Sequence, residues 1–473
     1  MSSIERFENI VLGGGEAGKY IAWELARQGQ RVAVVEKGLI GGSCPNIACL
    51  PSKNLIHSAK VTDHVRHAST FGLRLGPWSV DMAGVRQRKR EMVDGLIAIH
   101  QARFAVEGLE FILGEGRFTG PKAIEVRLTQ GGTRRLEAEC VFLNLGTHAA
   151  IPDIPGLSGA APLTHVEALE LDRLPAHLIV LGGGYIGLEM AQAFRRFGSK
   201  VTVIEQAPQL APREDPDVAD AVRAIFAEDG IDVVLGAAIG AIDGRSGNQV
   251  GVRLLTPDGE RKIDGSDLLV AAGRIPNTRG IGLESARVEL DSRGYIKVNE
   301  RLETTAPDVW AMGECAGSPQ FTHVAYDDFR IVRDNLAGRS RTTRNRLIPY
   351  CMFTDPELGR VGLGEAEAKR RGIAVRVARL PMNSVLRARA IGETRGFMKA
   401  IIDARSDRIL GFTMLGSGAG EVIAAVQTAM LAGLEYTGLR DAILTHPTMA
   451  EGLGVLLAGV PAMTQIMHAH AVR

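Results

Sequence analysis

The sequence predicts an α/β fold in which one strand, glycine turn and helix unit occurs twice. In the first copy, an apolar strand leads into a Gly-x-Gly-x-x-Gly turn that starts at Gly13, and the next strand ends at Glu36. In the second copy the turn starts at Gly182 and the next strand ends at Glu205. The copies align without a gap at an offset of 169 residues. One such motif is a weak signal, but two with matching surroundings predict two Rossmann-like units.

The chemistry of these units explains their residue types. Glycines allow the tight turn and let the backbone approach a pyrophosphate, and the following helix offers free N–H groups to that anion. The carboxylates of Glu36 and Glu205 stand where they can accept hydrogen bonds from ribose hydroxyls. The sequence therefore predicts two bound dinucleotides.

A cysteine motif follows the first unit directly. Cys44 and Cys49 stand five positions apart between a glycine pair and a Pro-Ser-Lys run. In a regular helix, residues i and i+5 are about 7.5 Å apart along the axis, which is too far for a disulfide. We therefore expect the segment to begin irregularly and to enter its helix late, with Pro45 and Asn46 suited to that entry. A disulfide made this way suits electron transfer better than structural cross-linking.

The position of the cysteine motif indicates which dinucleotide each unit binds. The copy next to the cysteines is expected to hold FAD, because a flavin can pass electrons directly to a disulfide. The second copy is expected to hold an exchangeable nicotinamide nucleotide. Glu205 would repel a 2′-phosphate and so favours NADH, although Arg213 could still reach such a phosphate and NADPH stays open.

Composition limits the remaining choices. A length of 473 residues allows about three domains, and a net charge of +1 gives no case for nucleic acid or an anionic membrane as partner. No apolar run approaches the ~20 residues that span a bilayer. The chain runs into a strand at residues 9–12, without space for a signal peptide. Five cysteines fit a reducing cytoplasm, so we expect a cytoplasmic enzyme with a catalytic disulfide.

With these motifs in place, the chain resembles the class I pyridine nucleotide–disulfide oxidoreductases, a family that includes glutathione reductase, lipoamide dehydrogenase and mercuric reductase. The resemblance covers essentially the whole chain and rests on the segments 41–53, 271–278, 305–314, 349–362 and 446–451. It implies two Rossmann-like domains, one for FAD and one for NAD(P)H, followed by an α+β dimerisation domain. The implied limits are 1–150 and 275–345 for FAD, 151–274 for NAD(P)H and 346–473 for the interface of a homodimer.

The resemblance also implies binding residues for both cofactors. Those for FAD are Gly13, Gly15, Glu16, Ala17, Gly18, Glu36, Lys37, Gly42, Ser43, Lys53, Gly116, Gly146, Thr147, Arg274, Gly313 and Glu314. Those for NAD(P)H are Gly182, Gly184, Tyr185, Ile186, Gly187, Glu205 and Gly273, and Tyr185 corresponds to an aromatic gate in glutathione reductase.

In this family hydride passes from the nicotinamide to the flavin and then opens the disulfide. Cys49 would lie nearer the flavin and Cys44 would attack the substrate. His446 of the partner subunit would act as acid and base, because a pKa near 6.5 lets histidine give and take a proton near neutrality. Glu451 would orient His446, although Thr448-x-x-Glu451 also fits a capping box.

Two further residues complete the implied catalytic set. Lys53 and Glu189 resemble the pair beneath the flavin, where a cation stabilises negative charge on the reduced ring. Cys140, Cys315 and Cys351 have no assigned role, and buried structural positions are the default for them.

Some positions depart from the best-known members. Ala48 replaces a glycine, Glu314 replaces an aspartate, and the segment 321–330 places the chain in a mercuric-reductase-like branch rather than with lipoamide dehydrogenase. The tail 468–473 lacks the cysteine pair of true mercuric reductases, which disfavours that activity.

The electron acceptor is therefore left open. The leading hypothesis for the function is NAD(P)H-driven reduction of a small disulfide. Reduction of Cu(II) or Hg(II) at the same thiol pair is the alternative, with His323, His468 and His470 as candidate contacts and no resident metal site expected. A flavin-bound redox sensor with little turnover is the third, and the presence of His446 argues against it, because sensing alone needs no acid–base group.

Overall fold

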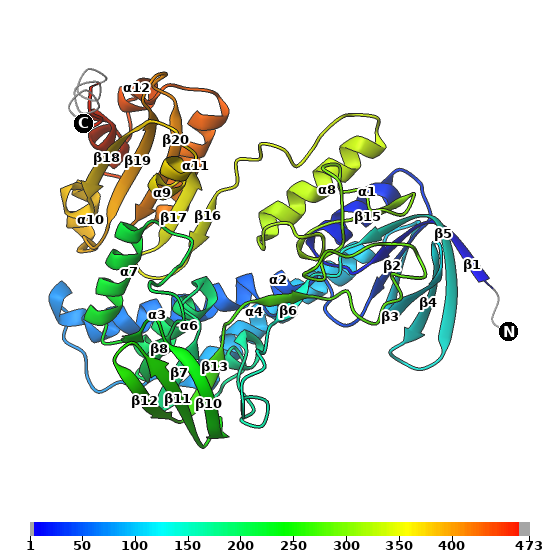
Figure 1. Cartoon of the computed structure of the whole chain (residues 1–473), viewed down its shortest axis with the longest axis horizontal. Coiled ribbons are helices and arrows are strands. Elements are labelled where there is room, and N and C mark those ends of the chain that lie inside the picture. The colour runs from blue at the N-terminus through cyan, green and yellow to red at the C-terminus, as the bar shows by residue number, and fades with distance from the viewer. Residues whose placement is uncertain (1–3, 463–473) are drawn as a thin grey trace.

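The computed structural model describes residues 4–462 and contains three main sheets of different construction, accompanied by a smaller three-stranded sheet and a two-stranded pairing (Figure 1). The first is mainly parallel, with β2 and β3 on one side of β1 and β5 and β15 on the other. The strand β4 pairs antiparallel with the far ends of both β3 and β5. The bounds are β1 Ile4–Leu12, β2 Val32–Glu36, β3 Leu109–Gly120, β4 Ala123–Leu128, β5 Thr133–Leu143 and β15 Val309–Ala311.

Helices cover this first sheet and carry its functional turns. All five residues of β2 are buried, as expected for a parallel strand covered on both faces. The helices α1 and α8 pack together through Tyr20 and Tyr326, whose ring centroids are 4.6 Å apart. The helices and short turns of this part are α1 Glu16–Arg27, α2 Ser43–Asn46, α3 Cys49–Arg66, η1 Ala68–Phe71, α4 Met82–Phe104, η2 Glu314–Ala316 and α8 Thr322–Leu336.

The second sheet repeats the parallel plan with the strand order β13-β7-β8-β9. An antiparallel sheet of β10, β11 and β12 extends it, and β6 pairs with β14 where the chain enters and leaves this part. The strands are β6 Thr147–Ala149, β7 His177–Leu181, β8 Lys200–Ile204, β9 Asp232–Val234, β10 Ala238–Arg245, β11 Gln249–Thr256, β12 Gly259–Gly265, β13 Asp267–Val270 and β14 Arg274–Pro276. The helices are α5 His165–Ala168, α6 Tyr185–Phe197 and α7 Pro216–Glu228.

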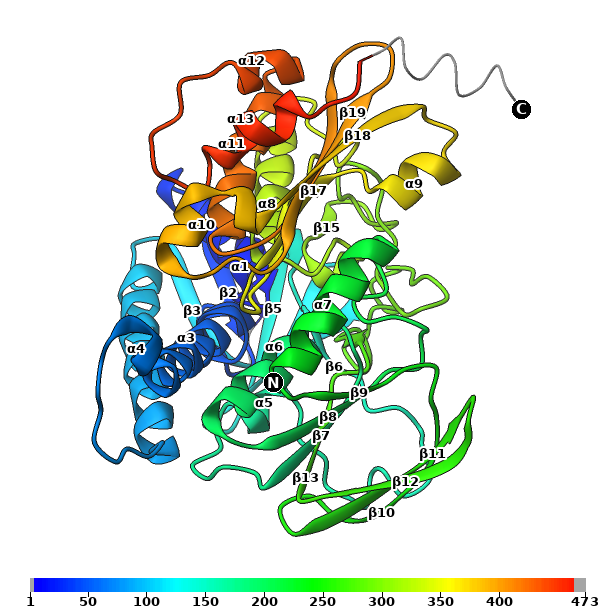
Figure 2. The ribbon, with the colours of Figure 1, turned by 90° about the vertical axis from the view of Figure 1, so that its left-hand side faces the viewer.

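The third sheet is antiparallel, with the order β16-β17-β20-β19-β18. Figure 2 shows it above the second sheet, with helices of the C-terminal part beside it. Its strands are β16 Tyr350–Met352, β17 Leu358–Gly362, β18 Val375–Pro381, β19 Phe397–Asp403 and β20 Ile409–Leu415. Its helices and turn are α9 Glu365–Arg370, η3 Met382–Ser384, α10 Leu386–Ile391, α11 Ala419–Leu431, α12 Tyr436–Arg440 and α13 Gly452–Ala458.

These three sheets confirm the predicted fold class of two Rossmann-like units and a C-terminal α+β part. Within residues 4–462, no helix is long and apolar enough to cross a membrane.

Candidate active site

The first glycine turn joins β1 to α1 and brings the backbone close to itself. Gly13 has a φ of +95°, and a Cβ at Gly18 would lie 2.1 Å from the Gly13 carbonyl oxygen. The Glu36 carboxylate accepts hydrogen bonds from the backbone N–H groups of Gly14 at 2.8 Å and Gly38 at 2.9 Å. This turn lacks the side chains that would fill it, and α1 begins there with its free N–H groups, so it fits a dinucleotide pyrophosphate.

The second turn has the same geometry. Gly182 has a φ of +114°, and a Cβ at Gly187 would lie 2.1 Å from the Gly182 carbonyl oxygen. Glu205 accepts hydrogen bonds from the N–H groups of Gly183 at 2.6 Å and Ala207 at 2.8 Å, as Glu36 does in the first turn. The residues present therefore fit a second dinucleotide.

A polar network lies on the other side of the first turn. The Thr147 hydroxyl donates to Glu314, and Arg274 Nε lies 2.6 Å from Thr147 Oγ1 and 3.3 Å from Glu314 Oε2. The Gly313 N–H donates to the buried Asp328 at 2.8 Å. These contacts hold the predicted FAD residues of three separate segments together.

Three other predicted FAD residues flank the first turn in different ways. Gly42 approaches its backbone, because a Cβ there would be 2.5 Å from the Gly15 Cα. Lys37 points to solvent, with its side chain 80% exposed and paired to Glu115. Gly116 lies inside β3, where a Cβ would meet Leu12 and Val35.

The two cysteines stand at the end of one short helix and the start of the next. Cys44 lies in α2, and Cys49 is the first residue of α3. The long helix thus begins later than the predicted entry at Pro45 and Asn46, because both residues belong to α2, where the Asn46 side chain donates to the carbonyls of Ile40 and Gly42. This break brings Cys44 and Cys49 close enough for each to shift the pKa of the other.

The two sulfurs have opposite electrostatic surroundings. A hydrogen bond from Cys44 lowers the pKa of Cys49 to about 6, opposed by burial and helped by Thr322 and Lys53. The same contact and burial raise the pKa of Cys44. Thr322 Oγ1 lies 3.3 Å from Cys49 Sγ, at the first turn of α8. Cys49 is therefore the sulfur that ionises first.

A cation follows one helical turn after Cys49. Lys53 Nζ lies 2.7 Å from Glu189 Oε2 of α6 and 4.8 Å from the centroid of the Phe353 ring. The other oxygen of Glu189 accepts the Phe353 N–H at 2.8 Å. Lys53 and Glu189, predicted from separate segments, are thus in direct contact.

His446 contacts Glu451 rather than the cysteines of its own chain. Its Nδ1 lies 2.9 and 3.0 Å from the two carboxylate oxygens of Glu451, and its side chain is 61% exposed. The Glu451 N–H also donates to Thr448 Oγ1, which is one of the two hydrogen bonds of a capping box. Glu451 therefore contacts His446 and also takes part in the helix start. Within residues 4–462, no hydrogen bond joins His446 to either cysteine.

The other three cysteines make no hydrogen bond to Cys44 or Cys49 in the described part of the chain. Burial raises the pKa of Cys315 to about 11 and also raises the pKa values of Cys140 and Cys351. The described part of the chain contains no group of three or more His, Cys, Asp or Glu side chains suited to a metal ion. His468 and His470 lie outside the described residues.

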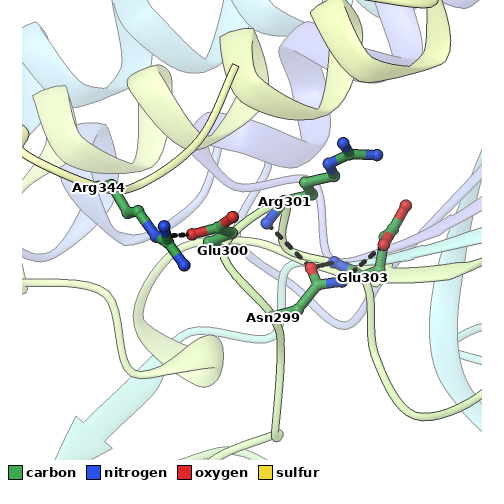
Figure 3. A pocket seen from close by; sticks show the side chains of 5 residues that line it. All are labelled: Asn299, Glu300, Arg301, Glu303 and Arg344. Atoms are coloured by element: carbon green, nitrogen blue, oxygen red, sulfur yellow. Dashed lines mark hydrogen bonds and ion pairs between the residues drawn. The ribbon is translucent and has the colours of Figure 1, made fainter. Parts of the chain in front are cut away.

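A charged surface pocket of about 420 Å³ lies elsewhere, lined by Asn299, Glu300, Arg301, Glu303 and Arg344 (Figure 3). Glu300 pairs with Arg344, and the Asn299 side chain accepts the N–H groups of Arg301 and Glu303. These groups satisfy one another, and none belongs to the predicted site.

Three residues of the site were not predicted from sequence. Thr322 contacts Cys49 across 273 residues of chain. The Asn144 side chain accepts the Gly18 N–H at 3.0 Å, across 126 positions of chain. The buried carboxylate of Glu214 accepts from Tyr185, and no local motif marks it.

Fold and site together define a two-dinucleotide oxidoreductase with a dithiol centre, and comparisons with known proteins agree. Residues 7–328 match the family described as pyridine nucleotide-disulphide oxidoreductase, and residues 348–456 match its dimerisation domain. The chain therefore belongs to the class I pyridine nucleotide–disulfide oxidoreductase family, as predicted. This family is FAD-dependent and uses a pyridine nucleotide.

The relatives place the chain within that family. It is 37% identical to the probable pyridine nucleotide-disulfide oxidoreductase RclA of Escherichia coli, over 96% of this chain and 99% of the relative. It is 36% identical to a mercuric reductase of Streptomyces lividans, over 94% of both chains. A solved Cu(II) complex of the HOCl-induced flavoprotein disulfide reductase RclA superimposes with a TM-score of 0.88 at 37% identity, over 96% of this chain and 99% of that one.

Proposed function

We propose that this protein is an FAD-dependent, NAD(P)H-driven reductase that passes electrons through the Cys44–Cys49 pair to a small disulfide. The observation that carries this proposal is the pair itself, whose sulfurs differ in pKa and lie beside Lys53 and the first turn of α8. When bound, FAD would supply the electron pair that opens the disulfide.

The unequal thiols suggest distinct tasks. Cys44, protonated because its pKa is raised, needs a base before it can attack a substrate disulfide. Attack forms a mixed disulfide and releases one substrate thiolate, which takes up a proton. Cys49 then attacks Cys44, the Cys44–Cys49 disulfide closes and the second substrate thiol leaves, so that two electrons have moved to the substrate.

We infer that the base is His446 of the partner subunit. His446 is exposed, makes no hydrogen bond to either cysteine within residues 4–462, and has its Nδ1 facing Glu451, which leaves Nε2 for the thiol. Figure 2 shows α13, the helix that follows Glu451, on the C-terminal sheet above α3. A homodimer in which segment 346–473 forms the interface would complete the site.

We further infer the cofactor domains and the preferred nucleotide. Segments 1–150 and 275–345 would hold FAD through the residues named above, and 151–274 would hold the nicotinamide nucleotide. Glu205 carries a negative charge beside the ribose position, which favours NADH, while the exposed Arg213 is the residue that could offset this preference.

A second candidate acceptor is a metal ion. The similarity to a Cu(II) complex of a flavoprotein disulfide reductase favours Cu(II) among metals. Such a reaction would use the same thiol pair, with the ion as substrate rather than resident cofactor.

An anaerobic acceptor panel tests these proposals. Holoenzyme reduced by NADH or NADPH is mixed with small disulfides, Cu(II) or Hg(II), and flavin reoxidation is followed. We expect a disulfide to reoxidise wild type, and His446→Ala to lose at least about tenfold of that rate while flavin reduction by NADH survives. Reoxidation by Cu(II) alone would favour the metal, and no reoxidation by any acceptor would refute the reductase.

The homodimer has its own test. Mixed dimers of a Cys44→Ser chain and a His446→Ala chain contain one intact composite site. We expect mixing to raise disulfide turnover well above that of either parent. Turnover by a monomeric fraction, or no restoration in verified mixed dimers, would contradict the shared site.

A further inference from the structure

A buried carboxylate holds the first side chain after the second glycine turn. Tyr185 opens α6, and its hydroxyl donates to Glu214, whose side chain is fully buried. Glu214 also accepts from the Tyr350 hydroxyl at 2.8 Å and from Arg360 Nη1 at 3.2 Å. Tyr185 is thus tied through one anion to two strands of the C-terminal sheet.

Tyr185 lies between the second dinucleotide turn and the redox centre. It is one helical turn before Glu189, so both side chains project from the same face of α6. Glu189 contacts Lys53, which is one turn after Cys49 on α3. The second turn, Tyr185, the Lys53–Glu189 pair and Cys49 therefore follow one another in space.

Aromatic packing holds the same side chain from the opposite direction. The rings of Tyr185 and Tyr350 have centroids 5.7 Å apart, and Tyr350 stacks on Phe321 at 5.7 Å with an angle of 2°. Burial, with the negative charge of Glu214, raises the pKa values of both tyrosines. Both hydroxyls therefore remain donors to Glu214 throughout the physiological pH range.

We propose that Glu214 is a latch that holds Tyr185 across the path from the second glycine turn to the Lys53–Glu189 pair, and that a pyridine nucleotide must release Tyr185 from Glu214 to reach the redox centre. A gate at Tyr185 is implied by the family resemblance; the new element is the residue that holds it closed. This inference rests on the proposed function, and Glu214 is a positioning residue in it.

The latch predicts that weakening it tightens nucleotide binding. If nucleotide binding must break the Tyr185–Glu214 hydrogen bond, this bond weakens binding, and a variant without it should bind the nucleotide more tightly. Tyr185→Phe keeps the ring but removes the donor, and we expect the Kd for NAD⁺ to fall about tenfold. Glu214→Gln keeps an acceptor without the charge, and we expect a fall of about threefold.

Tyr350→Phe is the matched control. It removes a phenol from the same carboxylate but leaves the Tyr185 bond intact. We expect its Kd to stay within about twofold of wild type. The double variant Tyr185→Phe, Glu214→Gln should bind as Tyr185→Phe alone, because both changes break one contact.

Calorimetric titration of the oxidised holoenzyme with NAD⁺ measures these constants without turnover. KM for NADH should fall in parallel in Tyr185→Phe, with kcat unchanged or lower. Unchanged or weaker NAD⁺ binding by Tyr185→Phe with normal FAD content would overturn the latch. NAD⁺ binding needs no electron acceptor, so this experiment is independent of the acceptor panel. If no acceptor reoxidises the flavin, the proposed reductase activity is refuted, but the effect of Tyr185→Phe on NAD⁺ binding can still be measured.

Discussion

Replacement of Thr322 by valine changes the one side-chain hydroxyl that contacts Cys49. Thr322 Oγ1 lies 3.3 Å from Cys49 Sγ and is among the causes that lower the pKa of Cys49 to about 6. A hydrogen bond to a charged group contributes ~1.5–3 kcal/mol, and one pKa unit corresponds to ~1.4 kcal/mol. Thr322→Val should therefore raise the pKa of Cys49 by about 1–2 units.

The pH at which Cys49 loses its thiolate form moves upward in the variant. A lowered pKa means that the thiolate is present above about pH 6 in wild type and is lost as the pH falls through that value. In Thr322→Val the loss should occur near pH 7–8, which is the wild-type value raised by about 1–2 units. The first turn of α8 remains in the variant, so its N-terminal N–H groups still favour the anion.

The assay is a pH titration of the dithiol enzyme under anaerobic conditions. A thiolate beside oxidised flavin produces long-wavelength absorbance, and its midpoint reports the Cys49 pKa. Thr322→Ser is the matched control, because it keeps the hydroxyl and should keep the midpoint. Equal midpoints in wild type and Thr322→Val would refute the reasoning, as would an equal rise in Thr322→Ser.

Three further predictions concern charged residues. Lys53→Met leaves Glu189 without its cation and should slow anaerobic flavin reduction by NADH at least about tenfold, whereas Lys60→Met, two turns further along α3, should not. Lys399 is 1% exposed and contacts Asp215 at 2.7 Å and Asp217 at 2.8 Å, so Lys399→Met should lower the free energy of unfolding in urea by about 3–5 kcal/mol. The half-exposed Arg379 on the same Asp217 should contribute less than about 1 kcal/mol. Glu205→Ala should raise the ratio of NADPH to NADH kcat/KM about tenfold, and an unchanged ratio would assign the preference to other residues.

Local sequence was sufficient for the parts of the fold that repeat. Each glycine turn needs its positive φ and close backbone approach within a few residues, so Gly13 and Gly182 could be found from spacing alone. Glu36 and Glu205, at the ends of β2 and β8, could be found from the same spacing, because each stands 23 positions after the first glycine of its turn. Lys53 and Glu189 came from the resemblance, and the structure adds their contact.

Residues that act across domains could not be found in this way. Thr322 reaches Cys49, and Glu214 reaches Tyr350, only through tertiary packing, in which strands of the second and third sheets form one buried cluster with α3 and α6. Threonine at a helix start and glutamate before a helix are common for capping reasons, so neither residue type indicates a site by itself. The late entry into α3 was predicted, but its position at Cys49 was not, because Pro45 and Asn46 form part of the separate short helix α2.

The number of reducing equivalents that the oxidised enzyme takes up tests the proposed electron path most directly. Anaerobic titration with NADH should reduce both the flavin and the Cys44–Cys49 disulfide in wild type, and only the flavin in Cys49→Ser. We expect wild type to accept one more two-electron equivalent than the variant, and to gain two titratable thiols on reduction where the variant gains none. Equal uptake by the two proteins, with normal FAD content in both, would contradict this electron path.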